Sequence, residues 1–115
     1  MTTKTFEKNL GIQIERYMNG LKIRTDKYFE AHYHNLIAPD FTAKVGKRYV
    51  KIIKSTDHGD DHLSNVSVHS FIDMTNGDIL MAASWKAPAK HARGNVFDAD
   101  NGMGATTIYG ANYLK

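Results

Sequence analysis

The sequence predicts an α+β fold in which an amphipathic N-terminal helix packs on a small antiparallel sheet, followed by a loop-rich C-terminal arm. Two observations predict it. Apolar residues recur at helical spacing through the first third of the chain, and later segments rich in β-branched and aromatic residues flank an Asn-Gly turn signal. With 115 residues, 42% of them hydrophobic and 23% charged, the chain has the size and composition of one folded domain. We divide it into a helical segment (1–38), an antiparallel sheet (46–85), and a basic loop with the C-terminal arm (86–115).

Residues 6–36 are expected to form the helix. Asn19-Gly20 is its weak point, because a glycine inside a helix costs about 1 kcal/mol relative to alanine, and the helix has a candidate break there. Ala38-Pro39 ends the segment, since proline has no amide donor. The apolar positions that predict the helix are separated mostly by three, four or seven residues: Phe6, Leu10, Ile14, Tyr17, Met18, Leu21, Tyr28, Phe29 and Leu36.

The same region has an alternative interpretation as a β-hairpin. Residues 12–18 and 21–25 alternate around Asn19-Gly20, and Asn-Gly is the strongest short hairpin signal. We favour the helix, because the apolar spacing continues in phase well beyond these two segments, which a hairpin would not require.

The sheet is expected from three segments. Residues 47–54 follow a glycine and are rich in β-branched and aromatic side chains, which is typical of a strand. Residues 66–73 and 78–85 flank Asn76-Gly77 and predict a hairpin whose two central residues form a type I′ turn.

A two-residue turn would fix which side chains share each face of this hairpin. Trp85 would lie opposite Val68 on a nearly all apolar face, which predicts a buried indole. His69 would lie opposite Ser84 on the mixed face, as a surface or half-buried residue. Because neither an orienting acid nor an oxyanion hole accompanies this Ser/His pair, we assign it no catalytic role.

Charge is distributed unevenly along the chain. Residues 1–54 carry 11 Lys+Arg and five Asp+Glu, net +6, whereas residues 55–115 carry four and seven, net −3, which together give the overall +3. A basic surface attracts polyanions, so nucleic acid is the first partner to consider. The alternative is a set of solvated lysines that keep the protein soluble.

The segment 84–95 leaves the predicted sheet and places basic side chains directly after a tryptophan. Lysine offers a point charge and arginine a bidentate fork for phosphate, while an aromatic ring can stack on a base. Tyr49 and Phe71 are the other aromatic residues of the predicted strands. Phe71 would lie on the mixed face of the hairpin, where it is a candidate base platform and equally a candidate core residue. The candidates for binding nucleic acid or another anion are Lys47, Arg48, Lys51, Trp85, Lys86, Lys90, His91 and Arg93.

Four stretches of this sequence resemble a group of small tailed-bacteriophage proteins of unassigned function. They read GKRYVKIIK from Gly46, SVHSFID from Ser67, NGDIL from Asn76 and ASWKAPAKHARGN from Ala83, and they span roughly the central half of the chain. The resemblance implies a viral origin and a location in the host cytoplasm or the virion. It brings no catalytic residues that could be carried over.

Metal chemistry would depend on histidine and carboxylate ligands, because the chain has six histidines and no cysteine. His32 and His34 lie about 200° apart on a helix and so cannot face one ion there, whereas on a strand they could. Residues 57–62 are rich in aspartate and histidine, but aspartate and glycine are ordinary turn residues, so we expect a solvated turn. We therefore assign no metal, no cofactor and no catalytic residue. A metal-dependent phosphodiesterase that uses these carboxylates is the alternative.

The leading function is that of a small accessory protein that binds nucleic acid, DNA or RNA, through its basic surface and residues 86–95, as a binder rather than an enzyme. One alternative is a virion or host-protein interaction component, with a homo-oligomer favoured by the small core. Another is a pocket for a small anionic ligand. No membrane partner is expected, because the longest apolar stretches, such as 79–83, fall far below the roughly 18 residues that cross a bilayer.

Overall fold

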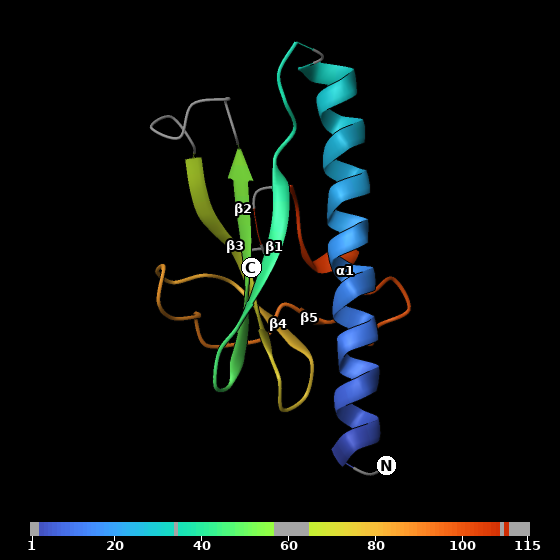
Figure 1. The fold of residues 1–115 in the computed structure, drawn as a ribbon, viewed down its shortest axis with the longest axis vertical. Coiled ribbons are helices and arrows are strands. Elements are labelled where there is room, and N and C mark those ends of the chain that lie inside the picture. The colour runs from blue at the N-terminus through green and yellow to red at the C-terminus, as the bar shows by residue number, and fades with distance from the viewer. Residues whose placement is uncertain (1–2, 34, 57–64, 109, 111–115) are drawn as a thin grey trace.

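A long helix packs along one face of a five-stranded antiparallel sheet, which confirms the predicted α+β class (Figure 1). The computed structural model describes residues 3–33, 35–56, 65–108 and 110. The strands lie in the order β1-β2-β3-β4-β5, so each strand pairs with its neighbours in sequence. The elements are α1 (Thr3–His32), β1 (Asp40–Val45), β2 (Tyr49–Thr56), β3 (Asn65–Asp73), β4 (Asp78–Leu80), β5 (Gly94–Asn95) and the 3-10 helix η2 (Met103–Ala105).

Helix α1 runs without interruption through Asn19-Gly20, so the candidate break is absent and the hairpin alternative is wrong. Tyr17 and Leu21, on either side of that dipeptide, are completely buried against the sheet. Burying two large side chains stabilises the helix by more than the roughly 1 kcal/mol that the glycine costs. The helix ends at His32, earlier than expected from the apolar spacing.

Replacing Gly11 by alanine is expected to raise the free energy of unfolding by up to about 1 kcal/mol. An added Cβ at Gly11 meets nothing within 4 Å, so the variant gains helix propensity without a clash. At Gly20 the same Cβ would lie 2.9 Å from the sulfur of Met103, so Gly20→Ala should gain less. Urea denaturation of both variants tests this, and an unchanged or lower stability of Gly11→Ala would contradict it.

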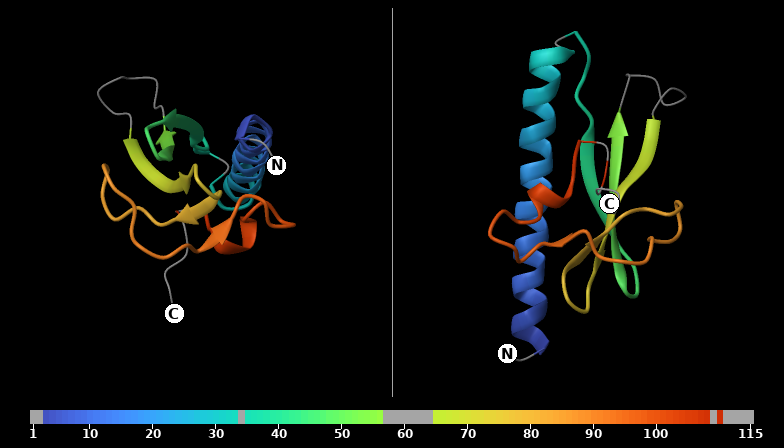
Figure 2. Two further views of the ribbon diagram at one scale, coloured as in Figure 1. Left: turned by 90° about the horizontal axis from the view of Figure 1, so that it is seen from below. Right: turned by 180° about the vertical axis from the view of Figure 1, so that it is seen from behind.

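The core lies between α1 and one face of the sheet. Strand pairing places Val50 opposite Ile72, and Ile72 opposite Ile79, so that one apolar row crosses β2, β3 and β4. These side chains are buried together with the inward residues of α1. Figure 2 shows the helix on this side of the sheet from two directions.

Strand β1 belongs to the sheet but was not predicted. Its sequence DFTAKV has no clear alternation of apolar and polar residues, and Phe41 is its one residue that packs against the core. It pairs with β2 from Asp40 opposite Ser55 to Val45 opposite Val50. The strand expected at 47–54 is observed two residues later, as β2.

The β3–β4 hairpin has a longer loop than predicted. Ile72 pairs with Ile79, and Gly77 alone has a positive φ in the loop, so Asn76-Gly77 does not form a type I′ turn. The Asp73 carboxylate instead accepts hydrogen bonds from the backbone N and the hydroxyl of Thr75, at 2.9 and 2.6 Å. These hydrogen bonds stabilise the longer loop, because the aspartate side chain accepts from the loop backbone in place of a partner on the opposite strand.

Strand β4 ends at Leu80 rather than at residue 85, which overturns the predicted burial of Trp85. Beyond that end, the Ser84 hydroxyl accepts hydrogen bonds from the amides of Lys86 and Ala87, both at 3.2 Å, in a turn that brings Pro88 back beside Ala82. Trp85 is consequently 46% exposed.

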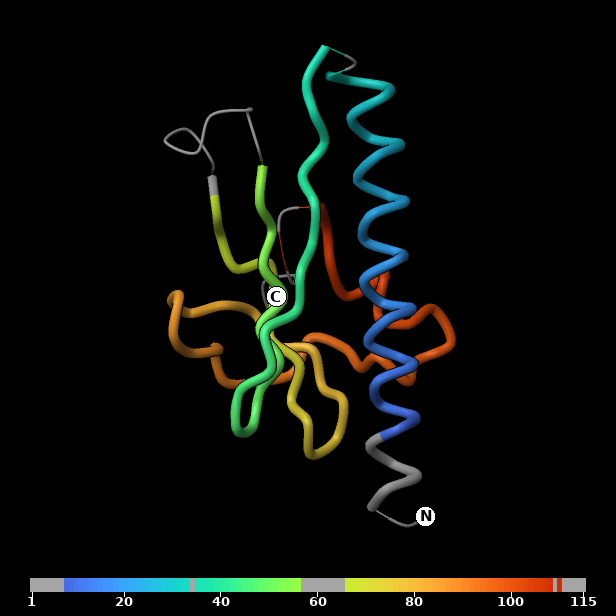
Figure 3. The backbone as a smooth tube through the Cα atoms, in the orientation of Figure 1, coloured from blue at the N-terminus to red at the C-terminus, as the bar shows by residue number. Residues whose placement is uncertain are grey.

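The chain after β4 crosses from the sheet to α1 and returns along the sheet (Figure 3). Arg24 holds this arm, because its guanidinium donates to the carbonyls of Met103 and Thr106 at 2.9 and 3.1 Å. Residues 57–62 and His34, which the sequence singled out as possible metal ligands, fall outside the described residues. Within the described ranges, no helix has the length and apolar composition that crossing a bilayer requires.

Candidate functional site

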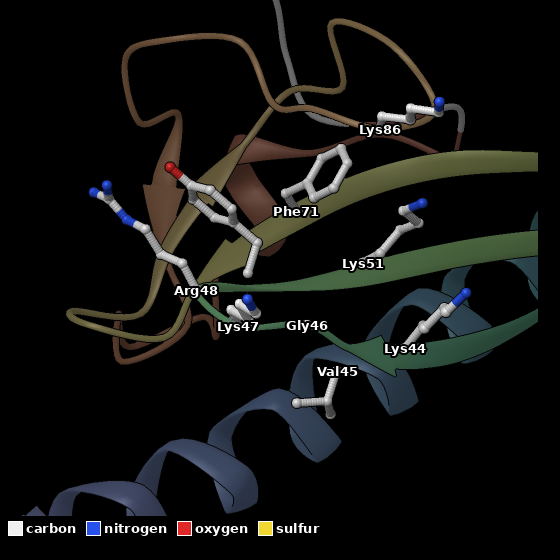
Figure 4. Close-up of a pocket in the computed structure, with 9 residues that line it drawn as sticks. Lys44, Val45, Gly46, Lys47, Arg48, Lys51, Phe71 and Lys86 are labelled. Atoms are coloured by element: carbon white, nitrogen blue, oxygen red, sulfur yellow. The ribbon is translucent and has the colours of Figure 1, made fainter.

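A basic groove lies on the face of the sheet opposite α1 and encloses about 350 Å³ (Figure 4). Five of its lining residues are lysine or arginine and two are aromatic. They come from the end of β1, the turn to β2, the first half of β2, the last part of β3 and the loop after β4. The lining residues are Lys44, Val45, Gly46, Lys47, Arg48, Tyr49, Lys51, Phe71 and Lys86.

Strand register brings the centre of the groove together. Lys44 of β1 pairs with Lys51 of β2, and Lys51 pairs with Phe71 of β3. Directly paired residues point to the same face of a sheet, so two lysines lie side by side next to a phenyl ring. Phe71 is only 3% exposed and forms the apolar floor, with the ring of Tyr49 edge-on at 6.2 Å.

Arg48 borders the groove beside Tyr49, and its charge already has partners. Its guanidinium lies 3.2 Å from the Asp73 carboxylate and 5.2 Å from the centre of the Tyr49 ring. Partial burial opposes ionisation of Asp73, but hydrogen bonds from Thr75 and Arg48 outweigh it and lower the pKa of the carboxyl. Arg48 is therefore in part a structural residue that fixes the turn between β1 and β2 against the end of β3.

The other four cations of the groove form no ion pair with a carboxylate of the described residues. These cations are Lys44, Lys47, Lys51 and Lys86. Lys22 on α1 shows the contrast, because its ammonium lies 3.0 Å from Asp26 and 2.8 Å from Asp40. Lysines without an acidic partner leave a concentrated positive field at the groove.

Trp85 lies next to the groove through Lys51, whose ammonium sits 4.4 Å from the centre of the indole. It is the one tryptophan of the chain. This contact joins an exposed aromatic surface to the pair of lysines on β1 and β2.

The structure brings together only some of the residues that the sequence singled out. Lys47, Arg48, Lys51 and Lys86 line the groove, and Trp85 contacts it. The other three candidates, Lys90, His91 and Arg93, are not among its lining residues. Arg93 is bound within its own loop, because its guanidinium donates to the His91 carbonyl and lies 3.7 Å from the Met81 sulfur.

Sequence reasoning missed Lys44 as a site residue. Its partner is Lys51, and that pairing exists only because β1 adds to the sheet. The segment that contains Lys44 has no sequence pattern typical of a strand, so the sequence did not indicate that Lys44 would lie opposite Lys51. Phe71, in contrast, occupies the outer face as expected, as the floor of the groove rather than an open platform.

His69 lies on the α1 side of the sheet, not opposite Ser84 on the outer face. The register between β2 and β3 shifts between Ile52 and Ile53, which leaves His69 as an extra residue in β3. Such a bulge changes the direction of a side chain. His69 is 1% exposed and has no access to a ligand in the groove.

A chain of hydrogen bonds satisfies this buried histidine. Its Nε2 lies 2.7 Å from the Thr107 carbonyl, which can only accept, so Nε2 carries the proton. Its Nδ1 then accepts from the Ser70 hydroxyl at 3.0 Å, and that hydroxyl accepts from Tyr17 at 2.6 Å. Burial is the main cause that lowers the pKa of His69 to about 4, so the ring is neutral at pH 7. This network connects α1, β3 and the C-terminal arm.

Among the residues that the structure describes, no three histidine, aspartate or glutamate side chains form a group that could hold a metal ion. The acidic and histidine-rich stretch 57–62 falls outside them. The basic groove itself is lined mainly by cations and aromatic rings.

The chain belongs to a family of unknown function, DUF7717, whose model matches residues 2–112. The match spans α1, the sheet and every residue that lines the basic groove. No curated protein and no solved structure matches the chain.

Proposed function

We propose that the protein binds nucleic acid, with the lysines of the basic groove on phosphate groups. One observation carries the proposal: Lys44 and Lys51 lie directly opposite each other on adjacent strands, with no described carboxylate paired to either. Like charges directly opposite each other on adjacent strands destabilise a sheet. A bound phosphate would offset this repulsion, which gives the paired lysines a role in binding in addition to keeping the edge of the sheet solvated.

The aromatic floor favours nucleic acid over a simple inorganic anion. Binding a phosphate ion requires only donors and charge, whereas here the cations surround Tyr49 and Phe71. Sugar and base carry apolar surface that such a floor can cover. A groove of about 350 Å³ is also within the range of small-ligand sites, so a free nucleotide is the second candidate.

Fluorescence anisotropy of labelled oligonucleotides across a salt series tests the proposal. We expect the logarithm of affinity to fall linearly with the logarithm of salt concentration, because phosphate contacts release counterions. Lys44→Ala/Lys51→Ala should weaken binding to every sequence and reduce the magnitude of that slope by roughly 2, about 1 for each lost phosphate contact.

The matched control is Lys8→Ala/Lys27→Ala, which removes the same charge from exposed positions of α1. If affinity depended on net charge alone, both double variants would weaken binding equally, and the groove would not be the site. A third variant, Lys90→Ala/Arg93→Ala, tests the later part of the loop. Absence of binding at low salt, or binding that salt does not change, would overturn the proposal. Competition by free nucleotides at equal affinity would favour the second candidate.

A further inference from the structure

We propose that the basic groove takes single-stranded nucleic acid, with an unpaired base against the exposed Trp85 ring and phosphates on Lys51 and its neighbours. This inference rests on the proposed function and names its substrate class. A duplex keeps its bases paired inside the helix and offers a protein surface its phosphates and groove edges. A single strand offers both phosphates and free base faces.

The arrangement of charge around the rings is the first argument. Figure 4 shows Lys44, Lys51 and Lys86 on the same side of the Phe71 ring. These lysines come from β1, β2 and the loop after β4, so the positive side chains cross the sheet. A strand backbone that followed them would pass Lys51, whose ammonium contacts the exposed Trp85 ring, and would bring a base within reach of that indole. A duplex would contact the outer lysines and leave the hollow between them unfilled.

The contact between Lys51 and Trp85 is the second argument. The ammonium lies 4.4 Å from the ring centre, and Trp85 has no place in the apolar core. A cation over an exposed indole contributes about 0.5–1 kcal/mol, which does not by itself account for a large exposed aromatic residue. A phosphate that attracted Lys51 would move the ammonium away from the indole and free that face of the ring for a base. Charge binding and stacking would then be coupled through one lysine.

The experiment compares three ligands of equal length and charge per strand: a single-stranded oligonucleotide, an abasic strand with the same phosphodiester backbone, and a duplex. The emission of Trp85 reports binding directly, because it is the one tryptophan. We expect the single strand to bind about tenfold more tightly than the abasic strand and to change Trp85 emission, since stacking of one base contributes roughly that factor.

Two variants separate stacking from charge. Trp85→Ala should weaken binding of the single strand about tenfold and leave the abasic strand unchanged, whereas Trp85→Phe should restore most of the loss. Both changes are at an exposed position beyond the end of β4, and circular dichroism checks that they fold. Lys44→Ala/Lys51→Ala should weaken the binding of all three ligands.

The outcomes distinguish this inference from the proposed function. If all three ligands bind equally and Trp85→Ala has no effect, the preference for single strands is wrong and the phosphate site stands. If the duplex binds more tightly than the single strand, the inference is wrong as well. If none of the three ligands binds, both proposals are wrong.

Discussion

Lowering the pH from 6.5 to 4 is expected to reduce the free energy of unfolding by roughly 3 kcal/mol through His69 alone. The folded protein holds the pKa of this histidine at about 4, against an ordinary value of 6.5. Between these two values the unfolded chain binds a proton that the folded chain does not. The stability contribution is therefore fully present above pH 6.5 and is lost as the pH falls toward 4.

The cause of this low pKa is structural. Burial comes first, because a charged imidazole would lie in the core beside Tyr17. The Thr107 carbonyl favours the charged ring, but the positive charges of Lys54 and Arg24 oppose it. Protonation would also give Nδ1 a proton that faces the Ser70 hydroxyl and would break the direction of the hydrogen-bond chain.

Urea denaturation at pH 7 and pH 4.5 measures the effect, and His69→Gln is the matched variant. Glutamine can donate and accept hydrogen bonds but does not titrate in this range. Carboxylates such as Asp73, whose pKa is lowered, also destabilise the fold in acid, so the informative quantity is the difference between wild type and variant. His69→Gln should be less stable at pH 7 and lose less on acidification. Equal losses in both proteins would show that His69 is not the acid-sensitive group.

The long helix could be predicted from the sequence because its apolar spacing is local information. Leu10, Ile14, Tyr17 and Leu21 recur every three or four residues, and all four are buried. This spacing correctly predicted that the helix continues beyond Gly20, where helix propensity alone indicated a break. Burial against the sheet determined the outcome.

Strand β1 and the direction of His69 could not be predicted, because both depend on contacts between distant segments. The sequence of β1 has no apolar alternation, and it forms a strand by pairing with β2. The bulge between β2 and β3 turns His69 toward α1, and no residue in its own neighbourhood indicates this. The prediction for Trp85 was wrong for a related reason, because β4 ends at Leu80, five residues before the expected strand end, and the Ser84 hydroxyl then turns the chain.

The candidate site was half predictable on the same grounds. The basic character of residues 1–54 is a property of composition, and it identified Lys47, Arg48 and Lys51. The turn after β4 decides which cations of the following loop lie in the groove. It places Lys86 in the groove and leaves Lys90 outside it. Sequence indicates which charges exist, whereas strand register decides which of them act together.

Replacing Leu21 by alanine is expected to lower the free energy of unfolding by about 2–5 kcal/mol, because truncation of a buried leucine removes apolar contacts and leaves a cavity. Leu21 is completely buried between α1 and the sheet. Ile23, on the same helix and 56% exposed, provides the matched control, and Ile23→Ala should change stability by no more than about 0.5 kcal/mol. Urea denaturation at pH 7 measures both.

The same variant tests whether the two faces of the sheet act independently. Leu21 packs on one face, and the basic groove lies on the other, so the fraction of Leu21→Ala that remains folded should bind oligonucleotides with the wild-type Kd and salt slope. A domain of this size typically has about 5–15 kcal/mol of stability, which leaves most of the variant folded. A large loss of affinity in folded Leu21→Ala would mean that core packing controls the spacing of Lys44 and Lys51. The groove would then be a deformable site rather than one that strand pairing alone holds in place.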